Sequence, residues 1–256
     1  MDRAGAASFT ELVARPERGR VFAQEVRAGL GDVGPSGRTR LDAIVRWLQD
    51  VAYADVEDAG FAEAGYWVVR RTRLRVERFP RFRERVRAET FASGLGRVWA
   101  ERRTVLRGAD GARADAVALW VFIHPESGRP MSVEGPMGDA YLEATGGRRV
   151  SARLRQGAPP AAVQRRPWRF RAGDLDLAGH VNNAVYWSAV EEVLSAGEDD
   201  PQALDAELEH RAAGQAGAAE LLVDGPALWI TQGDGEVLAS AVVAPGRGDS
   251  GPGAGG

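Results

Sequence analysis

The sequence of 256 residues contains no cysteine and no lysine. Without cysteine the chain has no disulfide bridge, no thiolate metal site and no cysteine nucleophile. Its three histidines, His124, His180 and His210, lie far apart in the sequence. Three scattered histidines do not match the spacing of a histidine metal site, so neither a metal nor another cofactor is predicted.

Long apolar runs are also missing. No stretch approaches the roughly 18 consecutive apolar residues of a membrane span, and residues 1–10 lack the apolar run of a signal peptide. The formal net charge of only −3 gives no general attraction to nucleic acid or to an anionic membrane. We therefore expect a cytoplasmic protein without a membrane span and without a nucleic-acid partner.

The pattern of apolar residues predicts an α+β fold. Residues 39–59 form the clearest helix, because Leu41, Ile44, Val45 and Leu48 recur at spacings of three and four. Segments rich in Val, Trp, Phe and Thr surround this helix and are separated by Gly-containing turns, which is typical of antiparallel strands. These strands are predicted at 20–27, 66–77, 84–93, 97–107 and 114–124.

The second half of the chain repeats this order. A strand is predicted at 168–171, a helix at 182–195, and further strands at 206–211, 218–223, 227–232 and 236–243. The echo of Arg27-Ala28-Gly29-x-x-Asp32 in Arg171-Ala172-Gly173-x-x-Asp176 supports an internal duplication and places Ser36 opposite His180.

Two similar units therefore predict five parts of the chain. They are an N-terminal segment (1–18), a first unit (19–132), a connection (133–166) with a short helix near 138–144, a second unit (167–244) and a disordered tail (245–256). The tail is expected to lack structure because it has no apolar side chains to bury.

The chemistry is concentrated in residues 173–187, directly before the second predicted helix. This segment contains two carboxylates, a histidine, two asparagines and a tyrosine. Backbone N–H groups at a helix start lack internal partners and carry the positive end of the helix dipole, so they stabilise an oxyanion. A carboxylate just upstream can attack a carbonyl or activate water. These parts indicate acyl transfer, above all hydrolysis of a thioester.

The motif Asp-x-Asp-x-x-Gly-His-Val-Asn-Asn-x-x-Tyr, at 174–186, resembles the signature of hotdog thioesterases. From Phe22 to Val243 the chain resembles the acyl-ACP thioesterases, which join two hotdog units in one polypeptide. The resemblance implies a pseudo-dimer of two tandem hotdog folds, each a long helix wrapped by an antiparallel sheet. The first unit would hold the acyl chain and the second would carry catalysis.

The resemblance also implies roles for single residues. Asp176 matches the catalytic aspartate and His180 the catalytic histidine, while Asn182 and Asn183 match the paired asparagines of the motif. Plant-type enzymes carry an asparagine where this chain has Ala178, and a glutamate that aligns near Ala213.

The small-residue form of this loop resembles acyl-CoA thioesterases of the 4-hydroxybenzoyl-CoA type, which work with an aspartate and helix-start amides. Asp176 is accordingly expected to act as nucleophile or general base, and His180 to position it or to polarise the carbonyl. The amides of Gly179 and His180 would form the oxyanion hole. The first unit lacks these parts, which predicts one site per chain.

The expected activity is hydrolysis of fatty acyl-ACP in fatty acid biosynthesis, giving free fatty acid and the carrier thiol. Two alternatives stay open: an acyl-CoA thioesterase, and an acyl-binding hotdog protein with impaired catalysis because of Ala178 and Ala213. A hotdog hydratase is disfavoured because its Asn-Pro element is missing. Whether the chain forms a homodimer is left open.

Several polar residues also have a purely structural interpretation. Asp176 and Asn182 could cap local turns, and Tyr186 is expected in the core. The alternating Arg71, Arg73 and Arg75 predict either a solvated sheet edge or a docking site for an acidic acyl carrier protein or a CoA phosphate. Glu191 and Glu192 are expected on the helix surface, within reach of the site.

Overall fold

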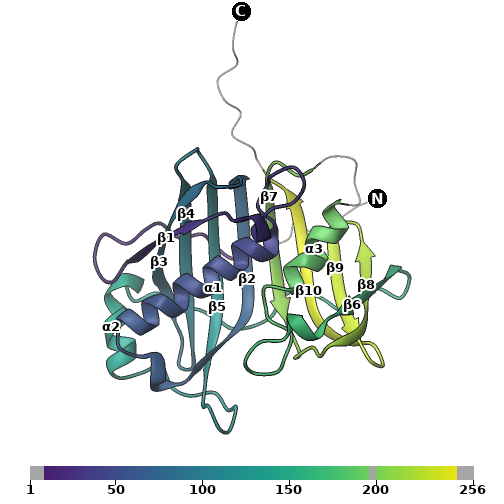
Figure 1. The fold of residues 1–256 in the computed structure, drawn as a ribbon. Coiled ribbons are helices and arrows are strands. Elements are labelled where there is room, and N and C mark those ends of the chain that lie inside the picture. The colour runs from purple at the N-terminus through teal and green to yellow at the C-terminus, as the bar shows by residue number, and fades with distance from the viewer. Residues whose placement is uncertain (1–8, 196–199, 247–256) are drawn as a thin grey trace, which may run out of the picture.

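The computed structural model describes residues 9–195 and 200–246, and the α+β prediction is confirmed (Figure 1). The first unit comprises β1 (Phe22–Arg27), α1 (Leu41–Asp58), β2 (Tyr66–Arg78), β3 (Arg85–Leu95), β4 (Trp99–Gly108) and β5 (Arg113–Ile123). The connection contains α2 (Pro136–Thr145). The second unit comprises β6 (Gln164–Phe170), α3 (Tyr186–Ser195), β7 (Leu204–His210), β8 (Gly217–Asp224), β9 (Ala227–Gln232) and β10 (Glu236–Pro245). Three short 3₁₀ turns are η1 (Leu30–Asp32), η2 (Ala62–Ala64) and η3 (Ala172–Asp174).

All the strands of the described residues form one antiparallel sheet of ten, in the order β1-β3-β4-β5-β2-β7-β10-β9-β8-β6. From edge to centre, the first unit contributes β1, β3, β4, β5 and β2, and the second contributes their counterparts β6, β8, β9, β10 and β7. The strand order is therefore symmetric about the centre of the sheet. The two units join where β2 pairs with β7, from Arg71 opposite Glu209 to Val76 opposite Leu204. The sheet is therefore a pseudo-two-fold structure, with the centre of the molecule at the β2–β7 seam.

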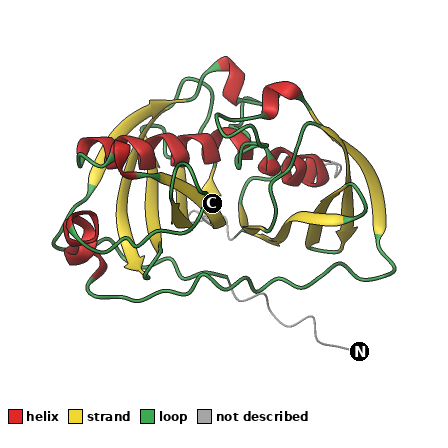
Figure 2. Cartoon of the chain, turned by 90° about the horizontal axis from the view of Figure 1, so that it is seen from below, coloured by secondary structure: helices red, strands yellow, loops and turns green. Residues whose placement is uncertain are grey.

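Both long helices lie on the same face of the curved sheet, α1 over the first unit and α3 over the second (Figures 1 and 2). The apolar stripe that predicts α1 is buried as expected, and Leu41, Ile44 and Val51 are fully enclosed. Trp187 and Tyr186 of α3 are also buried, in the same continuous cluster as the α1 residues. Because one core serves both helices, the two units form a single packed body rather than two linked domains.

The connection and the N-terminal segment run along the opposite side of the sheet (Figure 2). The indole N–H of Trp99 donates to the Val150 carbonyl at 2.8 Å, and that of Trp229 to the Gly157 carbonyl at 2.9 Å. These bonds tie the connection to one strand of each unit. Glu209, fully buried, accepts from the backbone N–H of Arg155 and further fixes the connection above the seam.

Two predictions from sequence are wrong. Arg71, Arg73 and Arg75 lie on β2, which is a central strand and not an edge. Arg71 is buried and donates to the Arg153 carbonyl, while Arg73 pairs with Asp205 at 2.6 Å. These two guanidiniums are engaged within the protein, so the stripe is not the solvated sheet edge that the alternation predicts.

The helix predicted at 182–195 begins four residues late, at Tyr186. The side chain of Asn182 accepts from the Ala184 N–H at 2.9 Å and the Asn182 carbonyl accepts from the Val185 N–H at 2.9 Å. These bonds form a turn in place of the first helical turn. The tail predicted to be disordered lies outside the described residues beyond Gly246.

Among the described residues, no helix combines the length and the apolar content needed to cross a membrane.

Candidate active site

Asp176 and His180 are brought together by a tight hairpin. Leu175 and Val181 form an isolated bridge, the Asp176 N–H donates to the His180 carbonyl at 2.8 Å, and the Gly179 N–H donates to the Asp176 carbonyl at 2.9 Å. Gly179 has a φ of 73°, a left-handed conformation that favours glycine. The motif therefore builds a compact loop between β6 and α3 with both candidate catalytic side chains on it.

The carboxylate of Asp176 is only partly satisfied. Its Oδ1 accepts from the Ala178 N–H at 2.9 Å, whereas Oδ2 accepts no hydrogen bond from the residues that the structure describes. Asp176 is half-buried, and its negative charge contributes to raising the pKa of two tyrosines. Burial is the larger cause of the raised pKa for both Tyr53 of α1 and Tyr186 of α3. Asp176 thus lies near both helices, one from each unit.

The other predicted residues have distinct surroundings. His180 is exposed, and within the described part of the chain neither its ring nor its backbone N–H has a hydrogen-bond partner. The Gly179 amide is occupied by the Asp176 carbonyl and is not available for an oxyanion in this conformation. Asn182 is used for the turn before α3. Asn183 is half-buried at the helix start, and its backbone N–H is without a partner among the described residues.

The first unit contains a loop with the same hydrogen-bond pattern. In both loops an aspartate accepts from a backbone N–H three residues earlier: Asp32 from Gly29 at 2.9 Å, and Asp174 from Arg171 at 2.7 Å. Three N–H to carbonyl bonds of the first loop have counterparts in the second. Gly34 to Arg38 corresponds to Asp176 to His180, and Gly37 to Gly34 corresponds to Gly179 to Asp176. Arg40 to Asp32 corresponds to Asn182 to Asp174. Gly34 therefore occupies the place of Asp176, and Arg38 the place of His180.

This register corrects the sequence alignment. The echo between the two halves places Ser36 opposite His180 and Asp32 opposite Asp176, which is wrong by two residues in each case. The echo is misleading because Asp32 and Asp174 share a capping role, while the reactive Asp176 has only Gly34 as its counterpart. The first loop therefore lacks the carboxylate altogether.

An ion network fills the corresponding position of the first loop. The Arg38 guanidinium is buried and pairs with Glu191 of α3 and, at 2.7 Å, with Asp200. The same Glu191 accepts from the Leu41 N–H at the start of α1, at 2.9 Å. Glu191 thus lies at the seam rather than on a solvated helix surface. This network therefore occupies, in the first loop, the position that His180 holds in the second.

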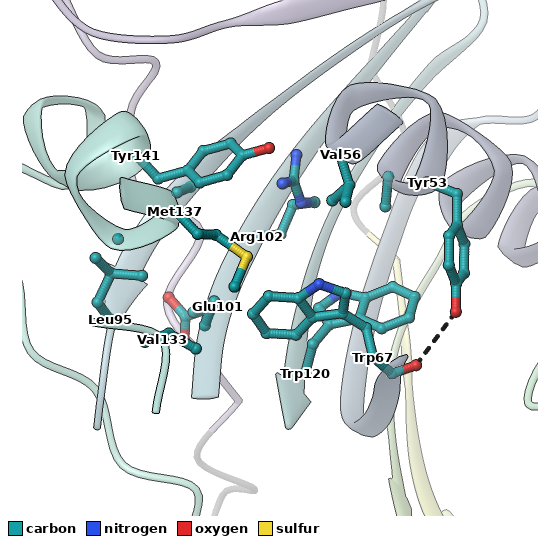
Figure 3. A pocket seen from close by; sticks show the side chains of 14 residues that line it. Tyr53, Val56, Trp67, Leu95, Glu101, Arg102, Trp120, Val133, Met137 and Tyr141 are labelled. Carbon is teal, nitrogen blue, oxygen red and sulfur yellow. Dashed lines mark hydrogen bonds between the residues drawn. The ribbon is translucent and has the colours of Figure 1, made fainter. Parts of the chain in front are cut away.

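An apolar pocket lies in the first unit, next to Tyr53 (Figure 3). It is lined by side chains from α1, α2 and strands β2 to β5. Two charged residues line it, but Glu101 pairs with Arg148 and Arg102 with Asp55. The pocket therefore presents mainly aromatic and aliphatic surface, from residues that include Val56, Trp67, Trp120, Met137 and Tyr141.

Tyr53 of α1 lies at the border of this pocket. Its ring lies edge-on to Trp120 in the pocket wall, with ring centroids 6.4 Å apart. Its hydroxyl is 3.5 Å from the Trp67 carbonyl, a long contact, and close to half of the residue is exposed (48%). The negative charge of Asp176 contributes to the raised pKa of this tyrosine, after the larger effect of burial.

A buried tyrosine–histidine pair lies next to the loop that contains Asp176 and His180, and is linked to it through Gly214. The Tyr186 hydroxyl accepts from the Gly214 N–H at 3.1 Å, and the Gly214 carbonyl accepts from the Val181 N–H at 3.0 Å. His210 lies edge-on to Tyr186, with ring centroids 5.0 Å apart. Burial, with a smaller contribution from Arg70, lowers the pKa of His210 to about 3. The imidazole is therefore neutral at physiological pH.

Replacing His210 with glutamine is expected to flatten the acid dependence of stability. A histidine that is neutral when folded but titrates near 6.5 when unfolded makes the unfolded state bind more protons, so its contribution is lost as pH falls below 6.5. Between pH 7.5 and pH 5 the wild type should lose about 2 kcal/mol more unfolding free energy than His210→Gln, at roughly 1.4 kcal/mol per pH unit. Denaturant unfolding at the two pH values measures this, and parallel losses would contradict it.

The paired units, each with a helix packed on one face of an antiparallel sheet, define a double-hotdog protein with a loop suited to thioester hydrolysis. Models of the acyl-ACP thioesterase N-terminal domain and C-terminal domain match residues 19–141 and 157–219, respectively. The chain belongs to the acyl-ACP thioesterase family, and its enzyme class is thioester hydrolase.

Known proteins agree with this assignment at low identity. An uncharacterized protein of Mycobacterium tuberculosis is 27% identical over 184 residues, covering 72% of this chain and 74% of that protein. The chloroplastic oleoyl-acyl carrier protein thioesterase 2 of Arabidopsis thaliana is 24% identical over 60% of this chain and 49% of its own length. This chain therefore matches about half of the plant relative.

Solved structures show the same fold. The 12:0-ACP thioesterase from Umbellularia californica superposes with a TM-score of 0.68 at 22% identity, over 88% of this chain and 97% of that chain. An acyl-ACP thioesterase from Bacteroides thetaiotaomicron gives a TM-score of 0.67 at 17% identity, over 88% and 98%. The predicted double-hotdog architecture is thereby confirmed.

Sequence reasoning identified the loop but missed Tyr53 and the side chains of the pocket. One signal was present in the sequence: Tyr53 follows Ile44, Leu48, Val51 and Ala52 along α1 but introduces a hydroxyl at the edge of the apolar stripe. Such a residue indicates an amphipathic position, where an apolar ring and a polar tip face different surroundings.

Proposed function

We propose that this protein hydrolyses fatty acyl-ACP, with Asp176 as the general base. The observation that supports the proposal is an apolar pocket in the first unit, bordered by Tyr53, together with an Asp176 carboxylate in the second unit whose Oδ2 accepts no hydrogen bond from the described residues. An alkyl chain gains free energy by burial in such a pocket. The thioester would then lie beside Asp176 at the seam, and the carrier would remain outside.

The reaction needs no group beyond the chain, the substrate and water. Asp176 accepts a proton from water as the oxygen attacks the thioester carbonyl, and the C–S bond breaks when the tetrahedral intermediate collapses. The proton then passes from Asp176 to the departing thiolate, giving fatty acid and carrier thiol. We propose that His180, exposed on the same loop, polarises the thioester, and that the backbone N–H groups of His180 and Asn183 bind the oxyanion.

Release of free thiol from a panel of acyl-ACP and acyl-CoA substrates tests this proposal. We expect wild-type turnover with fatty acyl-ACP, at a higher kcat/KM than with the matched acyl-CoA. Equal or better use of acyl-CoA would favour an acyl-CoA thioesterase. Saturable binding of acyl-ACP without thiol release from either substrate class would favour an acyl-binding protein.

Filling the pocket should shift substrate use toward shorter acyl chains. Ala92 is buried in the pocket wall, and Ala92→Leu adds three carbons there at a cost of about 1–3 kcal/mol in stability. We expect kcat/KM to fall about tenfold or more for the longest substrate that the wild type accepts, since two or more lost methylene contacts are worth roughly 1.4 kcal/mol. The shortest substrate should be little affected. Ala23→Leu on β1, away from the pocket lining, is the control.

A uniform loss across all chain lengths in Ala92→Leu, with the folded fraction unchanged, would show that this pocket does not hold the acyl chain.

A further inference from the structure

The correspondence between the two loops extends into the helices that follow them. If Arg40 is matched with Asn182, then Ile44 is matched with Tyr186, Leu48 with Val190 and Gln49 with Glu191. The burial classes agree along this register from Ile44 to Asp50, and both Gln49 and Glu191 are half-buried at the edge of the buried stripe. Gln49 of α1 is therefore the counterpart of Glu191 of α3.

Glu191 reaches across the seam to the loop of the other unit. One carboxylate oxygen accepts from the Leu41 N–H at the start of α1, at 2.9 Å, and the other pairs with Arg38. The pseudo-two-fold relation gives the equivalent positions at the second loop, which contains Asp176. There Asn183 takes the place of Leu41, His180 the place of Arg38, and Gln49 the place of Glu191.

The contact between Glu191 and the Leu41 N–H also indicates where a carbonyl oxygen would bind in the second loop. In the first loop, a carboxylate oxygen of Glu191 occupies the helix-start N–H of Leu41. The matching N–H of Asn183 has no partner among the described residues, and neither does the Gln49 side-chain amide. Gln49 is followed one helical turn later by Tyr53, which lines the apolar pocket, so both residues face the same side of α1.

We propose that Gln49 is a catalytic residue that the first unit contributes to the site, and that its Nε2 donates a hydrogen bond to the thioester oxygen bound at the Asn183 N–H. This inference rests on the proposed thioester hydrolysis. It makes the oxyanion hole a shared structure, with one backbone donor from the second unit and one side-chain donor from the first.

The difference between the two helices agrees with this role. Glu191 is an acceptor that neutralises a buried arginine, whereas the amide of Gln49 is neutral and supplies donors. A carboxylate at position 49 would repel the negative charge that develops on the thioester oxygen. A neutral donor such as the amide stabilises that oxyanion without adding a second negative charge to the one that Asp176 carries.

Steady-state kinetics of Gln49→Met and Gln49→Glu test the assignment. Both variants keep the length of the side chain and remove the donor, so kcat should fall about 10²-fold with KM changed less than threefold. The matched control is Glu191→Gln, which changes the counterpart of Gln49 on α3, where it pairs with Arg38 of the first loop. This variant should keep kcat within threefold of the wild type. Thermal unfolding checks that each variant is folded.

The outcomes separate this inference from the proposed function. If the wild type hydrolyses acyl-ACP and Gln49→Met keeps its kcat, the assignment is overturned and the function stands. A Gln49→Glu variant as active as the wild type would show that an acceptor suffices, which also overturns it. A wild type without thioesterase activity would instead remove the proposed function on which the assignment depends.

Discussion

Replacing Asp176 with asparagine is expected to lower kcat for acyl thioester hydrolysis about 10³-fold, within the range that a general base contributes. Asparagine has the same shape and its Oδ1 still accepts from the Ala178 N–H, so the hairpin should keep its conformation. The amide cannot take a proton from water, and the oxygen that is unpaired in Asp176 is replaced by a donor group. Single-turnover and steady-state assays of thiol release measure the loss.

Asp174→Asn is the matched control. Asp174 lies two residues earlier in the same loop and also accepts one backbone N–H, from Arg171 at 2.7 Å. Asparagine retains that acceptor, so the control should stay within about threefold of the wild-type rate. If Asp176→Asn retained normal turnover in folded protein, the general-base assignment would be untenable, while the thioesterase class would be unaffected.

Replacing Asp55 with alanine should destabilise the protein by about 3–5 kcal/mol, because it removes the carboxylate that pairs with the largely buried Arg102 and one of the two carboxylates that pair with Arg20. Asp55 of α1 is fully buried and accepts from the Nε of Arg20 at 2.6 Å and from the guanidinium of Arg102. Arg102 also lines the apolar pocket of the first unit, where an unpaired guanidinium would be poorly solvated. Chemical denaturation gives the change in unfolding free energy.

Asp58→Ala provides the comparison for Asp55. Asp58 pairs with the same Arg20, but 59% of its side chain is exposed. Exposed ion pairs contribute about 0–1 kcal/mol, so this variant should be close to the wild type. Equal decreases in unfolding free energy for the two variants would mean that the buried Asp55–Arg102 pair stabilises the packing of α1 on β4 no more than an exposed pair does.

Local sequence patterns predicted most of the architecture. The stripe from Leu41 to Ala52 indicates one buried helical face, and the helix forms there because the side chains of this stripe from Leu41 to Val51 reach the common core while Ala52 packs in a neighbouring cluster. The hairpin strands follow from β-branched and aromatic runs between glycine turns. The catalytic loop was also predictable, because the residues from Asp174 to Tyr186 are contiguous and need no long-range contact to be recognised.

The partners of the site were beyond the reach of sequence patterns, because they depend on long-range packing. Glu191 meets Arg38 across the seam, although more than a hundred residues separate them in the sequence. The β2–β7 pairing buries Arg71, which its alternating neighbours had suggested would be exposed. Nothing local distinguishes Asp32, whose Oδ2 accepts the Gly29 N–H, from Asp176, whose Oδ2 accepts no hydrogen bond from the described residues.

The covalent joining of the two units has a consequence for how the site can change. In a symmetric dimer of identical chains, every substitution appears twice, so an arginine at the histidine position would disable both loops at once. Here Arg38 and His180 are encoded separately, and each can be altered without the other. The fused chain therefore permits one loop to be used as scaffold while the other is tuned, and substitutions around Arg38 offer a way to adjust rigidity independently of chemistry.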